Sequence, residues 1–289
     1  MVRALKGLEG VLSMTVVHPI WQSTQPDGSG DDHRGWVFAK SRTRGGGVSN
    51  SDGLGGPFPN CYEGNQPDPI HGAASMRELY EKSGNDDGNY KVPILWDKQT
   101  GTIVSKESWQ IMRILNVAFN EFAKNPGLDL YPEGDRSKID AVCDWMYPTL
   151  NNGVYRCGFA MTQKAYDDSL DDLAVAFDQV EGHLRKHRYL CGPALTEADL
   201  RLFVTLIRFD EVYSIYFKCN VRSVADSPTL LGYCQDLYQM VGIRETIDMQ
   251  QIKAHYYCSH PDLNRYSIIP RGRGFLKLLE EHHNRSDLP

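Results

Sequence analysis

The sequence lacks the marks of several specialised classes of protein. It has no cysteines in CxxC spacing, and its seven cysteines are scattered through 289 residues rather than forming a compact framework. It contains no apolar run near the roughly 20 residues that cross a bilayer, and no signal-peptide pattern at its start. Basic residues do not prevail either, because 31 Lys and Arg stand against 37 Asp and Glu. We therefore expect a cytoplasmic protein that binds neither membranes nor nucleic acid.

The remaining composition is typical of a globular protein. Hydrophobic residues make up 41% and charged residues 24% of the chain, which suits one large domain or two modest ones. Pro126 and Gly127 interrupt a helical pattern, and residues 126–136 have the character of a linker. We predict an α/β domain over residues 1–125 and an all-α domain over residues 126–289.

The first predicted domain has the order strand, long loop, helix, hairpin and helix, which fits the second half of a thioredoxin-like fold. Residues 3–9 look like the end of a helix, and because a domain rarely begins in mid-helix, we expect a segment upstream of Met1. A polar stretch at about 40–70 is expected to be a long mobile insertion. The expected elements are a strand over 11–17, a helix over 73–80, strands over 90–96 and 102–104, and a helix from Ser108.

Helical periodicity dominates the second predicted domain. Apolar residues recur every three or four positions from Tyr166 to Leu184, which indicates a long helix with one buried face. Thr196 and Asp199 precede another apolar stripe with the spacing of an N-terminal capping box. We expect this domain to be almost wholly helical.

Two short motifs in the first domain could bind a small charged ligand. Pro93 inside a predicted strand marks an edge, a bulge or a cis bond, and a cis bond would expose the backbone of Val92 to an extended peptide. An edge-strand proline without a ligand is an equally good interpretation. Glu107 and Ser108 open a helix, where free N–H groups favour an anion, so the pair suits an α-amino acid head group. Plain helix capping is the simpler alternative.

Aromatic residues supply the remaining candidates. Trp36, in a glycine-bounded apolar island, offers a stacking face and an N–H donor, or it anchors the loop. A phenol can donate a proton or hold an oxyanion, but with fifteen tyrosines most must be core residues. His255, Cys258 and His260 have no second ligand pair beside them, so we expect no metal site. The tyrosines considered are Tyr155, Tyr213, Tyr216, Tyr256 and Tyr257.

Taken in order, these motifs resemble a known family. Val92-Pro93, followed after a hairpin by Glu107-Ser108, is the order of the glutathione site in glutathione transferases. Longer stretches are similar to the glutathionyl-hydroquinone reductases, also called Xi-class transferases, which are close to the Omega class. These stretches are residues 35–38, 92–104, 151–159, 217–220 and 255–260. The resemblance covers essentially the whole chain apart from the predicted insertion.

The resemblance implies a fold and a reaction. It implies a thioredoxin-like N-terminal domain, a helical C-terminal domain and a homodimer. In the implied reaction a cysteine thiolate attacks the sulfur of a glutathionylated hydroquinone, and the hydroquinone leaves. A second glutathione then releases the first as glutathione disulfide, so glutathione is a co-substrate and glutathionylated hydroquinones are the other partner.

The resemblance also assigns site residues by motif. Tyr155 resembles the proton donor to the departing hydroquinone. Tyr213 and Tyr256 resemble pocket tyrosines that help to lower the thiol pKa, because phenol O–H groups favour a thiolate. The residues that resemble the glutathione contacts are Trp36, Val92, Pro93, Glu107 and Ser108.

The sequence departs from the family pattern at two important points. Asn89 stands where the family often has an arginine before the cis proline, with Lys91 as a substitute cation. The family's Cys-Pro-Trp-Ala motif does not occur, and we expect it to lie upstream of Met1, beyond a start assigned too late. The alternatives are a catalytically inactive glutathione-binding protein and a conventional glutathione-conjugating transferase.

Overall fold

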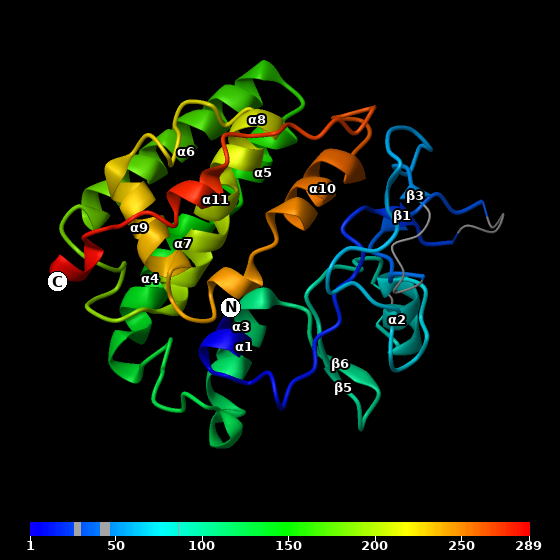
Figure 1. The fold of residues 1–289 in the computed structure, drawn as a ribbon, viewed down its shortest axis with the longest axis horizontal. Helices are drawn as coiled ribbons and strands as arrows, with labels where there is room; N and C mark the ends of the chain where they lie inside the picture. The colour runs from blue at the N-terminus through cyan, green and yellow to red at the C-terminus, as the bar shows by residue number, and fades with distance from the viewer. Residues whose placement is uncertain (26–29, 41–46, 86) are drawn as a thin grey trace. The chain divides into compact units, whose positions relative to one another are not determined.

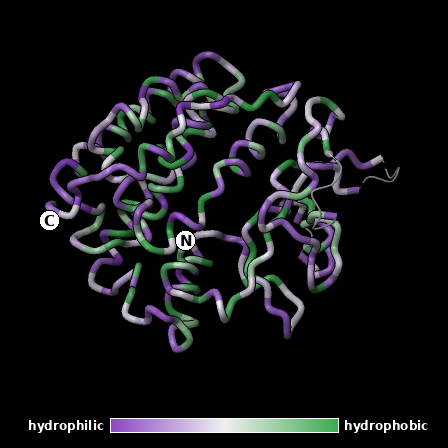
Figure 2. Tube along the Cα trace, viewed as in Figure 1, coloured by the Kyte–Doolittle hydropathy of each residue, from purple (hydrophilic) through white to green (hydrophobic). Residues whose placement is uncertain are grey.

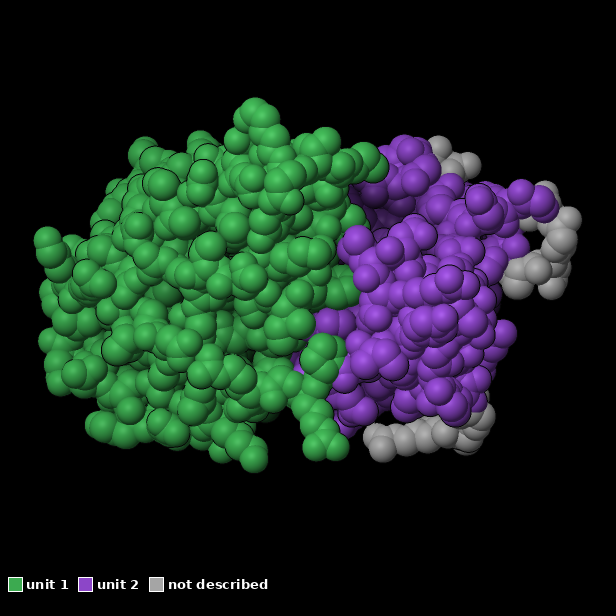
Figure 3. All heavy atoms as spheres, turned by 90° about the horizontal axis from the view of Figure 1, so that it is seen from above, with its two compact units in different colours: residues 1–9, 115–247, 270–289 green, residues 10–114, 248–269 purple. Residues whose placement is uncertain are grey.

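The computed structural model describes all of the chain except residues 26–29, 41–46 and 86, and it groups the chain into two compact units (Figure 1; Figure 3). Unit 1 consists of residues 1–9, 115–247 and 270–289, and unit 2 consists of residues 10–114 and 248–269. Each unit is therefore assembled from stretches that are far apart in the sequence. The predicted domain boundaries, 1–125 and 126–289, differ from the boundaries of these units, and the domain division stays a prediction.

Unit 2 combines short strands with helices. Its strands pair in three antiparallel two-stranded sheets: β1 (Gln22–Ser23) with β2 (Arg34–Gly35), β3 (Gly47–Val48) with β4 (Phe58–Pro59), and β5 (Leu95–Asp97) with β6 (Thr102–Ser105). Its helices are α2 (Met76–Lys82), α3 (Ser108–Val117), which ends in unit 1, and α10 (Met249–Ser259). The predicted hairpin and the two helices that flank it are thus present.

The core of unit 2 forms around α2. The first turn of this helix is capped, because Ser75 Oγ accepts from the N–H of Glu78 while Glu78 Oε2 accepts from the N–H of Ala74. The cap fixes where the helix begins and therefore which of its faces turns inward. The buried core residues are Phe38, Ala73, Met76, Leu79 and Tyr80.

The predicted strand over residues 11–17 is wrong. The only ladder contact that this segment makes with other described residues is an isolated parallel bridge between Val16 and Asn65. A strand needs backbone partners along its length, and a single bridging residue does not supply them. The predicted helix end over 3–9 is present only in part, as α1 (Val2–Leu5), which belongs to unit 1.

The described part of the predicted insertion, residues 47–70, is anchored by buried polar side chains. Asn50 is buried and its Nδ2 donates to Ser267 Oγ at 3.0 Å. Asn65 is also buried and donates to a glutamine on α10 at 2.9 Å. These bonds hold the stretch against residues 248–269 of the same unit, so this part is not the loose loop expected from its composition; residues 41–46 lie outside the described chain.

Unit 1 is helical, as its periodicity predicts, and hydrophilic and hydrophobic residues alternate along its helices (Figure 2). No helix in the described parts of the chain is long and apolar enough to cross a membrane. The longer helices are α4 (Arg136–Met146), α6 (Gln163–Leu184), α7 (Glu197–Arg208) and α9 (Pro228–Tyr238). The shorter ones are α1, α5 (Gly153–Gly158), α8 (Ser214–Tyr216) and α11 (Phe275–Leu278), with π-helical turns at Tyr147–Asn151 and Phe209–Tyr213. Single 3₁₀ turns lie at Asn120–Phe122, Glu133–Asp135, Arg244–Thr246 and Arg285–Asp287.

The capping box predicted at Thr196 and Asp199 is present and buried at the start of α7. Asp199 accepts from the N–H and the hydroxyl of Thr196, each at 3.0 Å, and from the N–H of Leu190 at 2.8 Å. The Tyr233 hydroxyl on α9 donates to the same carboxylate at 2.9 Å. One buried side chain thus ties the start of α7 to the preceding loop and to α9.

Candidate functional site

The Val92–Pro93 peptide bond is cis and lies just before β5. Val92 packs against the core of unit 2, whereas Pro93 is exposed. Pairing between β5 and β6 begins at Leu95, so the N–H and C=O of Val92 lie outside that ladder. This arrangement leaves the backbone of Val92 in the position from which it could pair with an extended peptide.

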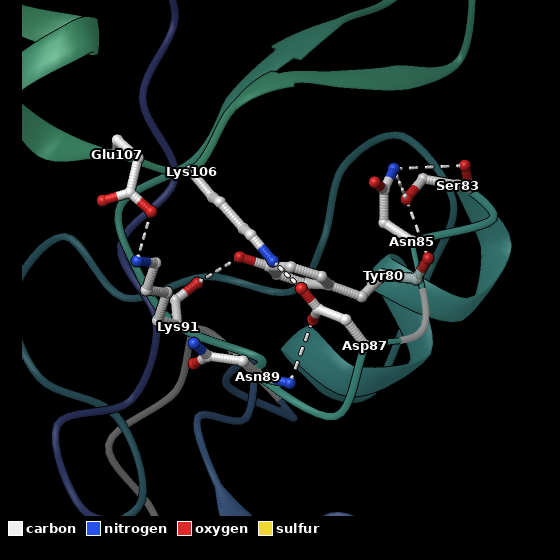
Figure 4. Close-up of polar contacts among 8 residues, drawn as sticks. All are labelled: Tyr80, Ser83, Asn85, Asp87, Asn89, Lys91, Lys106 and Glu107. Atoms are coloured by element: carbon white, nitrogen blue, oxygen red, sulfur yellow. Dashed lines mark hydrogen bonds and ion pairs between the residues drawn. The ribbon is translucent and has the colours of Figure 1, made fainter.

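Lys91, next to the cis bond, forms an ion pair with Glu107. Its Nζ lies 2.6 Å from Glu107 Oε1, and both side chains remain partly exposed, at 36% and 41%. The backbone of Lys91 is held in place because the Tyr80 hydroxyl donates to its carbonyl at 2.9 Å (Figure 4). The pair places a cation and a carboxylate together, and these are the two charges that complement an α-amino acid head group.

Ser108 is the first residue of α3 and its side chain is exposed. The preceding residue, Glu107, donates its N–H to Ser105 Oγ at 3.2 Å, which leads the chain into the helix. The first N–H groups of a helix have no partner within it, and its dipole is positive there. A carboxylate placed beside Ser108 would meet those N–H groups and the serine hydroxyl.

A second lysine, Lys106, lies near this site and was not identified from the sequence. It forms an ion pair with Asp87, whose Oδ1 also accepts the N–H of Asn89 at 3.1 Å (Figure 4). The hydrogen bond from Lys106 lowers the pKa of Asp87, and the Asn89 N–H adds to this effect. The position of Asn89, where the family often has arginine, is thus held by a neighbouring ion pair.

Trp36 belongs to an aromatic cluster within unit 2. Its indole stacks on the imidazole of His255 from α10, with ring centres 4.3 Å apart, and Trp21 packs edge-on at 5.9 Å. The ring of His260 lies 5.0 Å from that of Trp21, and burial lowers the pKa of His260. The two histidines that sequence analysis considered for a metal therefore pack against tryptophans.

The three candidate tyrosines are distributed over both units. Tyr155 on α5 is 36% exposed, whereas Tyr213 in the π-helical turn after α7 is buried, and their ring centres lie 5.9 Å apart in unit 1. Phe217 stacks on Tyr213 at 5.7 Å and lies 5.3 Å from Tyr155. Tyr256 on α10 belongs to unit 2, where its buried ring lies 5.1 Å from that of His255. The structure brings Tyr155 and Tyr213 together, and Tyr155 is the more exposed residue of the two.

Comparison with known proteins gives consistent similarities. Residues 163–236 match the family model described as the glutathione S-transferase C-terminal domain. The chain is 38% identical to glutathionyl-hydroquinone reductase YqjG of Escherichia coli K12, over 98% of the chain and 76% of that protein. It is 39% identical to glutathionyl-hydroquinone reductase PcpF of Sphingobium chlorophenolicum, over 93% of the chain and 76% of that protein.

Solved structures agree with the sequence matches. The glutathione-bound structure of the Escherichia coli protein is similar with a TM-score of 0.84 and 37% identity, covering 98% of this chain and 82% of that one. The Xi glutathione transferase ECM4 of Saccharomyces cerevisiae gives a TM-score of 0.83 and 32% identity, covering 97% and 87%. The predicted fold, a partial thioredoxin-like part with a helical glutathione transferase part, is thereby confirmed. The chain belongs to the glutathione transferase family, within its group of Xi-class glutathionyl-hydroquinone reductases.

Proposed function

We propose that the protein acts in the glutathione-dependent reduction of glutathionyl-hydroquinones. Its membership of the family supports the reaction class. The observation that carries the proposal is the Lys91–Glu107 ion pair at the start of α3, beside the cis Val92–Pro93 bond. These groups provide a carboxylate, a cation and a stretch of backbone outside the β5–β6 ladder in one place.

The γ-glutamyl head of glutathione supplies the complementary charges. In our proposal its ammonium takes over the contact of Glu107 with Lys91, and its carboxylate receives hydrogen bonds from Ser108 and the first N–H groups of α3. Lys91, once released from Glu107, adds a positive charge beside that carboxylate. The backbone of Val92 pairs with the peptide part of glutathione, while Trp36 and Asn89 complete the contacts.

The proposed chemistry uses a phenol as the proton donor. The departing hydroquinone oxygen or ring carbon needs a proton, and the phenol of Tyr155, a partly exposed residue, is the group that we assign to it. From the family resemblance, the phenols of Tyr213 and Tyr256 are assigned to the support of a thiolate, because phenol donors favour its charged form. The family's nucleophile belongs to a Cys-Pro-Trp-Ala motif that these 289 residues do not contain. We therefore expect this chain to bind glutathione, and to reduce substrate when a segment with that motif precedes it.

Glutathione affinity tests the binding site. Glu107→Gln removes the negative charge that accepts the ligand ammonium, and hydrogen bonds to charged groups contribute about 1.5–3 kcal/mol. Isothermal titration calorimetry should therefore show affinity for glutathione reduced by about 10-fold or more. Ser108→Ala should weaken binding in the same direction.

Two controls make this test specific. Glu121→Gln makes the same charge change at an exposed site in unit 1 and should leave affinity unchanged. Cysteinylglycine lacks the γ-glutamyl head, so its weaker binding should not respond to Glu107→Gln. If glutathione binding survives both Glu107→Gln and Ser108→Ala, the assignment of the site is incorrect.

Turnover assays distinguish the reduction from its alternatives. With the Cys-Pro-Trp-Ala segment joined upstream, release of hydroquinone from a glutathionylated benzohydroquinone is expected, and Tyr155→Phe should lower kcat more than it raises KM. Conjugation of glutathione to an aromatic halide without such release would favour the conjugating transferase. Binding without either reaction would favour the inactive binding protein. The family also implies a homodimer, for which light scattering should give about twice the chain mass of 32.7 kDa.

A further inference from the structure

Two of the seven cysteines, Cys157 and Cys219, lie against each other within unit 1. Cys157 is in the last turn of α5, and Cys219 follows the short helix α8. Cys219 Sγ lies 3.8 Å from the carbonyl oxygen of Val154, which is one turn before Cys157 on the same helix. Cys219 Sγ thus lies against the turn of α5 that ends with Cys157, and each thiol shifts the pKa of the other. Residues 62 positions apart in the sequence are thus brought together as a pair of thiols.

The turn that carries Cys219 is fixed from both sides. Lys218 has a φ of 60°, in the left-handed region that a lysine rarely adopts, and this reverses the chain after Phe217. The hydroxyl of Tyr166 donates to the Lys218 carbonyl at 2.6 Å, and the N–H of Cys219 donates to the Tyr213 carbonyl at 3.0 Å. These two hydrogen bonds hold the turn, and with it Cys219, in place against α5.

Cys157 also lines a cavity of about 430 Å³ in unit 1. Tyr166, Lys218 and Met161 form other parts of its wall, and Met161 is 98% exposed, so the cavity reaches solvent. Cys219 does not line it. Cys157 is 2% exposed and Cys219 has no exposed surface, so a small molecule in this cavity meets Cys157 before Cys219.

The charges around the pair distinguish the two thiols in the same way. The hydrogen bond from Cys219 lowers the pKa of Cys157, and the positive charge of Arg156 adds to that effect. The same contact raises the pKa of Cys219, and burial raises it further. Cys157 is therefore the thiol that ionises first, and a thiolate is the form that reacts with oxidants and electrophiles.

We propose that Cys157 and Cys219 form a redox-active dithiol, with Cys157 as the thiol attacked by a hydroperoxide entering the cavity and Cys219 as the resolving thiol. The Cys157 thiolate attacks one peroxide oxygen, the O–O bond breaks, and the other oxygen leaves as an alcohol or water after taking a proton. Cys219 then attacks the sulfenic sulfur, and water leaves as the disulfide forms. The hydroperoxide gains two electrons and the two thiols lose them.

Peptide mapping of the oxidised wild-type protein tests this proposal directly. Trypsin cleaves after Arg156 and after Lys218, so the two cysteines fall in separate peptides, 157–164 and 219–222, each with a single thiol. After treatment with hydrogen peroxide, denaturation and alkylation with N-ethylmaleimide, these peptides should appear joined. The protein should carry two fewer maleimide adducts than the untreated protein, and reduction with a phosphine should restore them.

Variants separate the roles of the two thiols. Cys219→Ser should stop the reaction at a sulfenic acid on Cys157 that dimedone traps, whereas Cys157→Ser should abolish both the cross-link and the trapped acid. Cys61→Ser is the matched control, because Cys61 is also buried but lies in unit 2, and its oxidation pattern should equal that of the wild type. Wild-type protein that forms no 157–219 cross-link, or that oxidises equally at all seven thiols, would overturn the proposal even if a serine variant fails to fold.

Discussion

Replacing Asp199 with alanine should destabilise unit 1 severely. The side chain has no exposed surface, and burial raises the pKa of Asp199 above that of an ordinary carboxyl group. Its oxygens accept hydrogen bonds from two backbone N–H groups, of Leu190 and Thr196, and from the hydroxyls of Thr196 and Tyr233. Three of these donors lose their acceptor in Asp199→Ala, whereas the Tyr233 hydroxyl keeps the backbone carbonyl of residue 199 at 3.3 Å.

The expected loss follows from the number of donors left without a partner. Each buried donor left unsatisfied costs about 1–3 kcal/mol, and partial relaxation makes the sum smaller than the separate costs. We expect Asp199→Ala to lower the free energy of unfolding by about 3–5 kcal/mol, a large part of the roughly 5–15 kcal/mol of a typical domain. Tyr233→Phe removes one of these donors and should cost less.

Urea denaturation followed by circular dichroism measures this loss as a lower midpoint at unchanged slope. Asp168→Ala is the matched control, because Asp168 pairs with Lys164 on the exposed face of α6 and should leave the midpoint unchanged. A loss below about 1 kcal/mol for Asp199→Ala would refute the argument, since it would mean that the buried network contributes no more than a surface contact.

Three further changes test the packing and the charges of unit 1. Burial alone would raise the pKa of Glu181, but hydrogen bonds from a serine and from two arginines, one of them Arg222, lower it below the ordinary value of 4.5. Glu181 therefore stabilises the fold above pH 4.5 and loses this contribution as the pH falls through its folded pKa. Glu181→Gln should accordingly flatten the fall in urea midpoint below pH 4.5. An unchanged acid profile would contradict this. A methyl group on Gly158 would overlap the ring of Phe217, so Gly158→Ala should cost about 1–3 kcal/mol by thermal or urea melting. An added methyl group at Gly182 on α6 meets nothing within 4 Å, so Gly182→Ala should stabilise the fold by about 0.5–1 kcal/mol. A loss of stability in Gly182→Ala, or an unchanged stability in Gly158→Ala, would refute the packing argument.

Local signals in the sequence predicted local structure well. The capping box at Thr196 and Asp199 was identified because its residues are three positions apart and their partners are their own backbone groups. The start of α3 at Ser108 follows from a similarly short signal. The strand expected over 11–17 failed because a strand depends on partners elsewhere in the chain, which apolar residues alone do not reveal.

Groups that meet through the fold could not be found in this way. Lys106 near the candidate site carries no motif of its own, and its pairing with Asp87 depends on how β6 returns past the loop before the cis bond. The stack of Trp36 on His255 joins residues more than 200 positions apart. The pairing of Cys157 with Cys219 could not be predicted either, because nothing in the sequence around Cys157 indicates Cys219. The motif resemblance identified Glu107 and Ser108, whereas the ion pair between Glu107 and Lys91 became visible only in the structure.

The chain passes between the two compact units four times, after residues 9, 114, 247 and 269. No single cut in the polypeptide therefore releases either unit intact. A fragment limited to residues 10–114 would lack residues 248–269, and with them the imidazole of His255 stacked on Trp36 and the Ser267 hydroxyl that receives the hydrogen bond of Asn50. A minimal glutathione-binding module would have to join residues 248–269 to the end of this fragment through a new linker. Recombination of this fold with another protein would likewise have to exchange two segments at once, so that the candidate glutathione site and the stack of Trp36 on His255 stay in one unit.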